Sequence, residues 1–175
     1  RSGSVTGVQT CALPIYLDAA FNAALAVINA ESSAAFGHLL ATGQLGEDVA
    51  TRLRRAASTS AADVAAANKV RREFAGEVDS LLQQVDVLAL PTLPILPPLT
   101  AEAGTQQSGI ALTALTRPFN LSGHPAISVP VPSDAILPAG LQLVGRRGED
   151  ELVCALAARI HAAANAGKPG RGRSN

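Results

Sequence analysis

Apolar residues recur at three- and four-residue intervals through the first half of the chain, which indicates helices. Residues 17–40 are alanine-rich and predict a long helix that stops at Thr42-Gly43. Residues 46–57 predict a shorter helix, with acids at its start and arginines at its end. The pair Ser60 and Asp63 has capping-box spacing and opens a third helix that runs to about Gln84. The apolar stripe expected on the first helix consists of Phe21, Leu25, Ile28, Phe36, Leu39 and Leu40.

Short continuous apolar runs replace this pattern in the second half. Residues 85–90, 126–131 and 141–145 are bounded by proline and glycine and predict buried strands. A crossover separates the first two strands, which allows them to be parallel neighbours, whereas the short link from residue 132 to 138 makes the last two antiparallel. The sequence therefore predicts an α/β fold, with a mixed sheet of about three strands covered by helices.

The segments between and after these strands complete the pattern. Residues 91–100 contain too many prolines for a helix or an interior strand and predict a rigid extended wall. Residues 109–115 predict a short helix, and residues 116–125 a polar turn ahead of a buried strand, where pockets are often built. A last helix starts at the acids of residues 149–151 and stops before Gly167. Its expected buried stripe is Leu152, Val153, Leu156, Ile160 and Ala164.

The two ends differ in composition from the rest. Residues 1–15 are polar and rich in glycine, serine and threonine, and they resemble a translated cloning or sequencing scar. We expect a non-native or disordered leader there, with a native terminus as the alternative. Residues 168–175 predict a disordered basic tail, which is a solvated end rather than a binding arm. The chain contains no methionine. We therefore expect residues 16–167 to form part of a domain from a longer product.

Composition narrows the classes of function. Of the 175 residues, 47% are apolar and 16% are charged, which predicts a globular protein. The formal net charge is zero, which argues against nucleic acid or an anionic membrane as partner. No run of about 18 apolar residues is present, so we expect no membrane span. The two cysteines lie far apart and in no metal-type spacing, which favours a reducing cytoplasm.

No complete catalytic set emerges from the side chains alone. The nucleophile pattern G-x-S-x-G is missing. Ser122 lies two residues before His124, but a turn-stabilising hydroxyl and a turn or pocket-lining imidazole explain both. Cys154 and His161 would stand about 10 Å apart on one helix, so we expect Cys154 to be a buried core thiol. The three histidines show no metal-ligand spacing, and we expect no metal.

Three stretches together resemble a known family. Residues 86–92 read DVLALPT, residues 116–130 read TRPFNLSGHPAISVP, and residues 138–145 read PAGLQLVG. Their order and spacing look like the C-terminal portion of the amidase signature family, and the resemblance covers about residues 16–167. The implied fold is a fragment of the amidase-signature α/β fold.

The resemblance implies a hydrolase of amide carbon–nitrogen bonds that needs no metal or organic cofactor. Its members transfer the acyl group to a serine and then to water, using a serine, cis-serine, lysine triad whose lysine must be neutral. This chain has no Gly-Gly-Ser-Ser-like run, and neither Lys69 nor Lys168 lies in the motif of the catalytic lysine. We therefore expect the triad to lie upstream and this chain alone to be inactive.

The resemblance also implies a pocket wall. Residues 116–125, called the pocket-wall segment below, are expected to border the acyl pocket. Asn120 is expected to brace the segment through side-chain hydrogen bonds, and Phe119 and His124 are candidates for lining, with plain packing as the alternative. The complete set of expected wall residues is Thr116, Phe119, Asn120, Gly123 and His124.

The expected partners follow from the same resemblance. They are a small-molecule amide in the whole enzyme, together with a homodimer or amidotransferase-type subunit contacts, and neither nucleic acid nor membrane. The alternative hypothesis is a non-catalytic interaction module, or an amidotransferase-subunit-like protein, on a degraded amidase fold. A helical scaffold with chance similarity is the third hypothesis.

Overall fold

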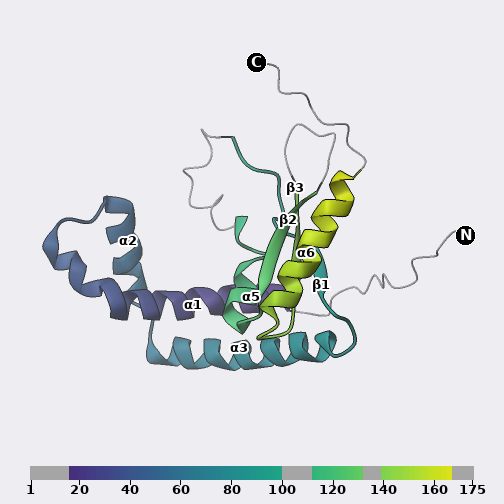
Figure 1. Ribbon diagram of the computed structural model, residues 1–175. Helices are drawn as coiled ribbons and strands as arrows, with labels where there is room; N and C mark the ends of the chain where they lie inside the picture. Colours follow the sequence, from purple (N-terminus) through teal and green to yellow (C-terminus); the bar gives the residue numbers. More distant parts are fainter. Residues whose placement is uncertain (1–15, 100–111, 132–138, 167–175) are drawn as a thin grey trace, which may run out of the picture.

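The computed structural model describes residues 16–99, 112–131 and 139–166 (Figure 1). Helices occupy most of the first half, and three strands and a long helix most of the second, so the α/β class is confirmed. The predictions for residues 1–15, 101–111 and 168–175 lie outside the described residues. The elements are α1 (Leu17–Phe36), the 3-10 helix η1 (Gly37–Thr42), α2 (Glu47–Ala56), α3 (Ala61–Leu82), β1 (Leu88–Pro91), α5 (Arg117–Ser122), β2 (Ala126–Val131), β3 (Ala139–Val144) and α6 (Asp150–Asn165).

The described strands form a sheet in the order β1-β3-β2, and β3 is antiparallel to both neighbours. Val144 of β3 pairs with Leu88 on one side and with Ala126 on the other. The prediction that β1 and β2 are parallel neighbours in a mixed sheet is therefore wrong. The two strands do run in the same direction, but β3 lies between them. A short link shows which strand pairs on one side of β3 and carries no information about its other side.

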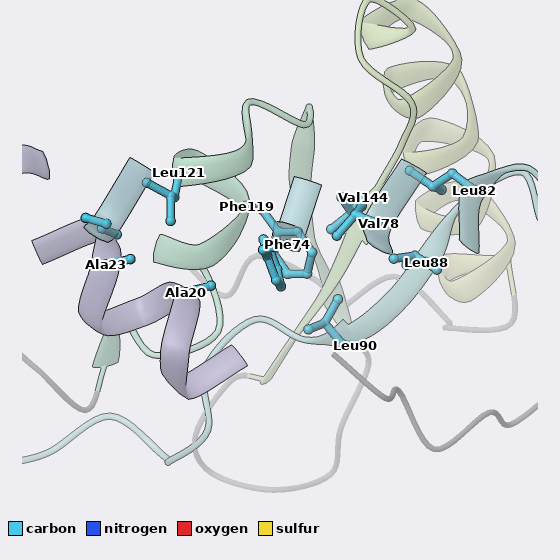
Figure 2. Close-up of a cluster of buried hydrophobic side chains, with 12 residues drawn as sticks. Ala20, Ala23, Phe74, Val78, Leu82, Leu88, Leu90, Phe119, Leu121 and Val144 are labelled. Atoms are coloured by element: carbon cyan, nitrogen blue, oxygen red, sulfur yellow. The ribbon is translucent and has the colours of Figure 1, made fainter. Parts of the chain in front are cut away.

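Alternate residues of the strands face two different helical layers. Leu88, Leu90 and Val144 point toward α1, α3 and α5, where they join the core around Phe74 and Phe119 (Figure 2). The opposite face is packed against α6. There Val129 and Leu143 contact Val153 and Ala157, together with the partly buried Ile127, Leu141, Leu156 and Ile160. The period of two along each strand thus separates two cores.

Helix α1 contacts the core through small residues and not through the predicted stripe. Ala20, Ala23 and Ala24 are buried, whereas Leu25, Ile28 and Phe36 are 40%, 54% and 54% exposed. The distance between packed helices depends on the side chains at the contact, and alanines allow a close approach. The helical period of α1 was predicted correctly, but the face assigned to the core was wrong.

Helix α6 buries a narrow stripe, because it covers only one face of the sheet. Val153 and Ala157 are buried, with Leu156 and Ile160 partly buried beside them. Leu152 is 41% exposed and Cys154 is exposed, so the prediction of a buried core thiol at Cys154 is wrong. Cys154 follows Val153 by one residue, about 100° around the helix, which carries its side chain away from the sheet. No helix among the described residues is long and apolar enough to cross a membrane.

The loop between β3 and α6 is fastened to the end of α3 by Arg146. Its Nε donates to the carbonyl oxygen of Leu82 at 2.8 Å, and its Nη2 donates to that of Val85 at 3.0 Å. Nη1 pairs with Glu149 at 3.1 Å. The last carbonyl groups of a helix lack partners within the helix and carry partial negative charge. A guanidinium held there satisfies the carbonyl of Leu82, the last residue of α3, and joins this helix and the segment that follows it to the loop after β3.

Candidate functional site

Most of the pocket-wall segment is a short helix, α5, and not an open turn. Pro118 lies in its first turn, where the fixed φ of proline suits a helix. Gly123 ends the helix with φ 76°, a left-handed conformation that favours glycine. A helix of six residues is not stable on its own in water. Burial of Pro118, Phe119 and Leu121 supplies the stability, which local propensity could not indicate.

Phe119 and Thr116 both make contacts with other residues of this chain in the described structure. Phe119 is fully buried, with its ring centroid 5.9 Å from that of Phe74 and the ring planes at 52° (Figure 2). This tilted arrangement is favourable for aromatic pairs. Thr116 is half-buried, and its hydroxyl donates to the carbonyl oxygen of Thr113 at 3.4 Å. A lining role for either residue stays a prediction.

Asn120 does not brace the segment through its side chain. The side chain is exposed and makes no hydrogen bond within the described part of the chain, whereas the backbone N–H donates to the carbonyl oxygen of Thr116 at 3.3 Å. In a helix the backbone groups are already used by the neighbouring turns. In a turn, the Asn120 side chain could bond to the nearby backbone, but in this helix it points outward. The predicted stabilisation of the segment by side-chain hydrogen bonds of Asn120 is therefore wrong.

Gln142 anchors the chain ahead of α5 to the middle of the sheet. Its side chain is 3% exposed, and Nε2 donates to the carbonyl oxygen of Leu115 at 2.9 Å. We did not predict this contact, although a glutamine within the apolar run 141–145 is a usable signal. A buried side-chain amide needs a hydrogen-bond partner. For a residue on a central strand, that partner is usually a backbone group of a segment packed against the sheet.

His124 is held between two partners from different elements. Its Nδ1 lies 2.9 Å from the Ser122 hydroxyl, and its Nε2 lies 3.2 Å from Oδ1 of Asp79 on α3. The other oxygen of Asp79 accepts from Arg147 of the β3–α6 loop. Burial lowers the pKa of His124, the carboxylate of Asp79 opposes that effect, and Arg147 adds to it. The Asp79 contact joins residues 45 positions apart and was not predicted.

Serine, histidine and aspartate are the residue types of a hydrolase triad, but this set lacks the required arrangement. Ser122 is 4% exposed, and its hydroxyl also lies 3.1 Å from the carbonyl oxygen of Phe119 in its own turn. A nucleophile must face a substrate and an oxyanion site. The hydroxyl therefore stabilises the turn, as the sequence predicted.

Arg117 contributes a half-buried cation at the start of α5. Its guanidinium lies 4.2 Å from the centroid of the Phe21 ring, and Nη2 donates to Oγ1 of Thr113 at 2.8 Å. Nη1 is buried without a hydrogen bond among the described residues. Burial lowers the pKa of Arg117, yet a guanidinium remains charged at neutral pH. The contact between this cation and the Phe21 ring holds the N-terminal end of α5 against α1.

A shallow hollow of about 220 Å³ opens beside the proline-rich stretch that follows β1. Close to it, Thr92 and Ser128 share a hydrogen bond of 2.6 Å between their hydroxyl groups. A Cβ added to Gly140 would lie 2.7 Å from both hydroxyl oxygens, so only glycine fits there. The hollow is lined by Pro91, Leu93, Pro94, Ile95, Leu96, Pro97, Ala139 and Gly140. Over the described ranges, no three histidine, cysteine or acidic side chains gather where a metal ion could bind.

Comparison with known proteins identifies the family. The sequence model of the Amidase family matches residues 7–154, which is most of the chain. The chain belongs to the amidase signature family. Members of this family hydrolyse amide carbon–nitrogen bonds.

Individual members show how much of an amidase this chain represents. It is 39% identical over 98 residues to a subunit of the glutamyl-tRNA(Gln) amidotransferase from Sulfurisphaera tokodaii, covering 55% of this chain and 21% of that protein. It is 35% identical over 124 residues to fatty acid amide hydrolase of Medicago truncatula, covering 67% of this chain and 20% of that protein. A crystal structure of an amidase superposes with a TM-score of 0.73 at 27% identity, covering 87% of this chain and 36% of that one. The chain thus spans about a fifth of these curated relatives.

Proposed function

We propose that this amidase-family chain forms one wall of the acyl pocket in an enzyme that hydrolyses amide carbon–nitrogen bonds. The wall is the pocket-wall segment, with Thr116, Phe119, Asn120, Gly123 and His124 as its members. The supporting observation is that the family match contains this segment, and that two buried side chains fix it in place. Gln142 ties its approach to the sheet, and His124 ties its end to α3.

The chemistry in this proposal belongs to a serine, cis-serine, lysine triad that this chain does not carry. Neither lysine of the chain lies in a matching motif, and the sequence contains no Gly-Gly-Ser-Ser-like run. The lysine of such a triad must be neutral to remove the serine proton, and the acyl group passes to serine and then to water. A rigid wall contributes by holding the acyl group close to the nucleophile. The chain alone is therefore inactive.

Inactivity is tested with the isolated chain. It is incubated with aliphatic and aromatic amides, and separately with a fluorophosphonate that labels activated serines. We expect no release of ammonia or amine above buffer and no labelling. Turnover, or labelling at Ser122, contradicts the proposal, and a Ser122→Ala variant locates the label.

The wall is tested in an active relative. The pocket-wall segment replaces its counterpart in the Medicago fatty acid amide hydrolase, and a second chimera carries the same segment with Gly123→Val. We expect the first chimera to keep hydrolysis with an altered KM and the second to lose most of it. Two folded chimeras that both behave like the parent enzyme show that the segment forms no wall.

A second candidate function is membership of an amidotransferase-like assembly without hydrolysis by this chain itself. The observation that favours it is the 39% identity to an amidotransferase subunit. The genomic reading frame upstream of Tyr16 separates the two candidates. A frame that continues into a Gly/Ser-rich signature supports the amidase, and a start codon close to Tyr16 supports the interaction module.

A further inference from the structure

Ser122, His124, Asp79 and Arg147 form a continuous chain of hydrogen bonds across α5, α3 and the β3–α6 loop. The side chain of His124 is fully buried, so both ring nitrogens need partners from the protein. Asp79 and Arg147 are the charged groups that the described structure brings to it. The direction of each hydrogen bond can be worked out for both protonation states of the imidazole.

In the neutral state, the carboxylate of Asp79 fixes the tautomer. An ionised carboxylate only accepts hydrogen bonds, so Nε2 of His124 carries the proton and donates to it. Nδ1 then offers a lone pair, and the Ser122 hydroxyl donates to it across 2.9 Å. The carbonyl oxygen of Phe119 loses that hydroxyl, but it still accepts the backbone N–H groups of Gly123 and His124 at 3.0 and 3.3 Å. Every polar group of this set therefore keeps a partner.

In the protonated state, both ring nitrogens donate. Nε2 keeps Asp79, and the added proton on Nδ1 is donated to the oxygen of Ser122. The hydrogen of that hydroxyl then turns to the carbonyl oxygen of Phe119, which lies 3.1 Å away. One bond rotates and no heavy atom has to move. The two contacts of Ser122 thus serve one protonation state each.

We propose that these residues form a proton-operated latch on the pocket-wall segment. His124 takes one proton from water at Nδ1 and releases it there, while the Ser122 hydroxyl reverses direction and the new positive charge faces Asp79. The latch changes the hydrogen bonding at the C-terminal end of α5 without opening the core. It is a property of this chain whether or not the segment lines an acyl pocket.

Burial, Asp79 and Arg147 together set the pH at which the latch operates. Burial lowers the pKa of His124, and Asp79 raises it. Arg147 lies on the second oxygen of Asp79 and its charge opposes protonation of the imidazole. The imidazole of His124 is therefore uncharged at neutral pH. It takes up its proton at a pH below the ordinary pKa of histidine. Because the side chain of Arg147 is half-exposed, its substitution can change the pKa of His124 without disturbing the core.

The tautomer is tested on the whole chain labelled with 15N at histidine. Two-dimensional NMR correlates the ring nitrogens with the ring protons and distinguishes a protonated nitrogen from a bare one. His38 and His161, which lie outside the latch, serve as references in the same spectrum. We expect neutral His124 to carry its proton on Nε2 and to gain the second one on Nδ1 while the chain stays folded. A neutral His124 with its proton on Nδ1, or unfolding as soon as His124 protonates, overturns the proposal.

Two substitutions are expected to shift the titration midpoint of His124 in opposite directions. Asp79→Asn keeps the shape but removes the carboxylate, so the titration midpoint of His124 shifts to lower pH. Arg147→Ala removes a positive charge from an exposed position, so the midpoint shifts to higher pH. Shifts in the same direction, or no shift in the folded Arg147→Ala variant, contradict the assignment of Asp79 and Arg147 to the latch.

Discussion

Three buried polar residues, Gln142, Ser122 and His124, hold the pocket-wall segment where it is. Gln142 and His124 reach partners 27 and 45 positions away in the sequence, whereas the Ser122 hydroxyl makes its contacts within its own turn, to His124 and to the carbonyl oxygen of Phe119. A hydrogen bond of this kind contributes little net energy when made but costs much when one partner is orphaned. Substitutions at these residues therefore probe the fixation of the segment directly.

Gln142→Leu is expected to destabilise the chain by about 1–3 kcal/mol, because it leaves the carbonyl oxygen of the partly buried Leu115 without its donor. Urea denaturation followed by far-UV circular dichroism measures the change. Gln84→Leu, at an exposed position, is the matched control and is expected to be nearly neutral. Equal effects of the two substitutions contradict the anchoring role of Gln142.

The stability of the chain is expected to fall as the pH drops below about 6.5, the ordinary pKa of histidine. The folded state lowers the pKa of His124, so the unfolded chain binds the proton more readily and acid favours unfolding. Above that pH the contribution is fully present, and it is lost as the pH falls through the folded pKa. Urea midpoints measured for the parent chain and for His124→Gln decide the matter. An equally steep fall in the variant assigns the dependence to other groups.

The single elements depend on caps and on close approaches at least as much as on periodicity. Helix α3 begins with a complete capping box, because the Ser60 hydroxyl accepts from the backbone N–H of Asp63 and the Asp63 carboxylate accepts from that of Ser60. The sequence predicted this box from spacing alone. At its other end the same helix relies on Arg146, which lies far along the chain beyond β3. That end could not be foreseen, since nothing local identifies the partner.

Ser60→Ala is expected to cost about 0.5–2 kcal/mol of stability, the usual effect of removing a helix N-cap. Ser60→Thr keeps the hydroxyl oxygen and serves as the conservative control. Thermal and urea unfolding of both variants measure the difference. A threonine variant as unstable as the alanine variant shows that the box does not cap α3.

Gly140→Ala is expected to destabilise β3 by about 1–3 kcal/mol, because the added methyl group meets two hydroxyl oxygens. The same substitution in a Thr92→Ala, Ser128→Ala background removes both oxygens and should cost less. This double-mutant cycle isolates the steric conflict from any general effect of alanine. If Gly140→Ala lowers the stability equally in both backgrounds, a clash with the hydroxyl groups of Thr92 and Ser128 is not the cause.

For the whole molecule, the sequence predicted the α/β class, the upstream helices, the three strands and the family. It could not predict the order of the strands, because the pairing of β3 with β1 leaves no trace in either strand alone. It also placed Leu25 and Ile28 in a core that alanines occupy, since a helical period does not show how closely a neighbour packs. The wall residues were predicted from resemblance and stay a prediction, whereas the contacts of Asp79, Arg147 and Gln142 required the tertiary structure.

The central position of β3 dictates when the sheet can form during synthesis. β1 and β2 emerge from the ribosome earlier, yet neither pairs with the other in the described sheet. Within the described residues both pair with residues 139–144, and the end of α3 likewise needs Arg146 from beyond that strand. A chain that stops at residue 131 is therefore expected to keep helical circular dichroism but lose protease resistance in β1 and β2. In a nascent chain the helices that precede β2 would form the stable part until residues 139–144 had been made.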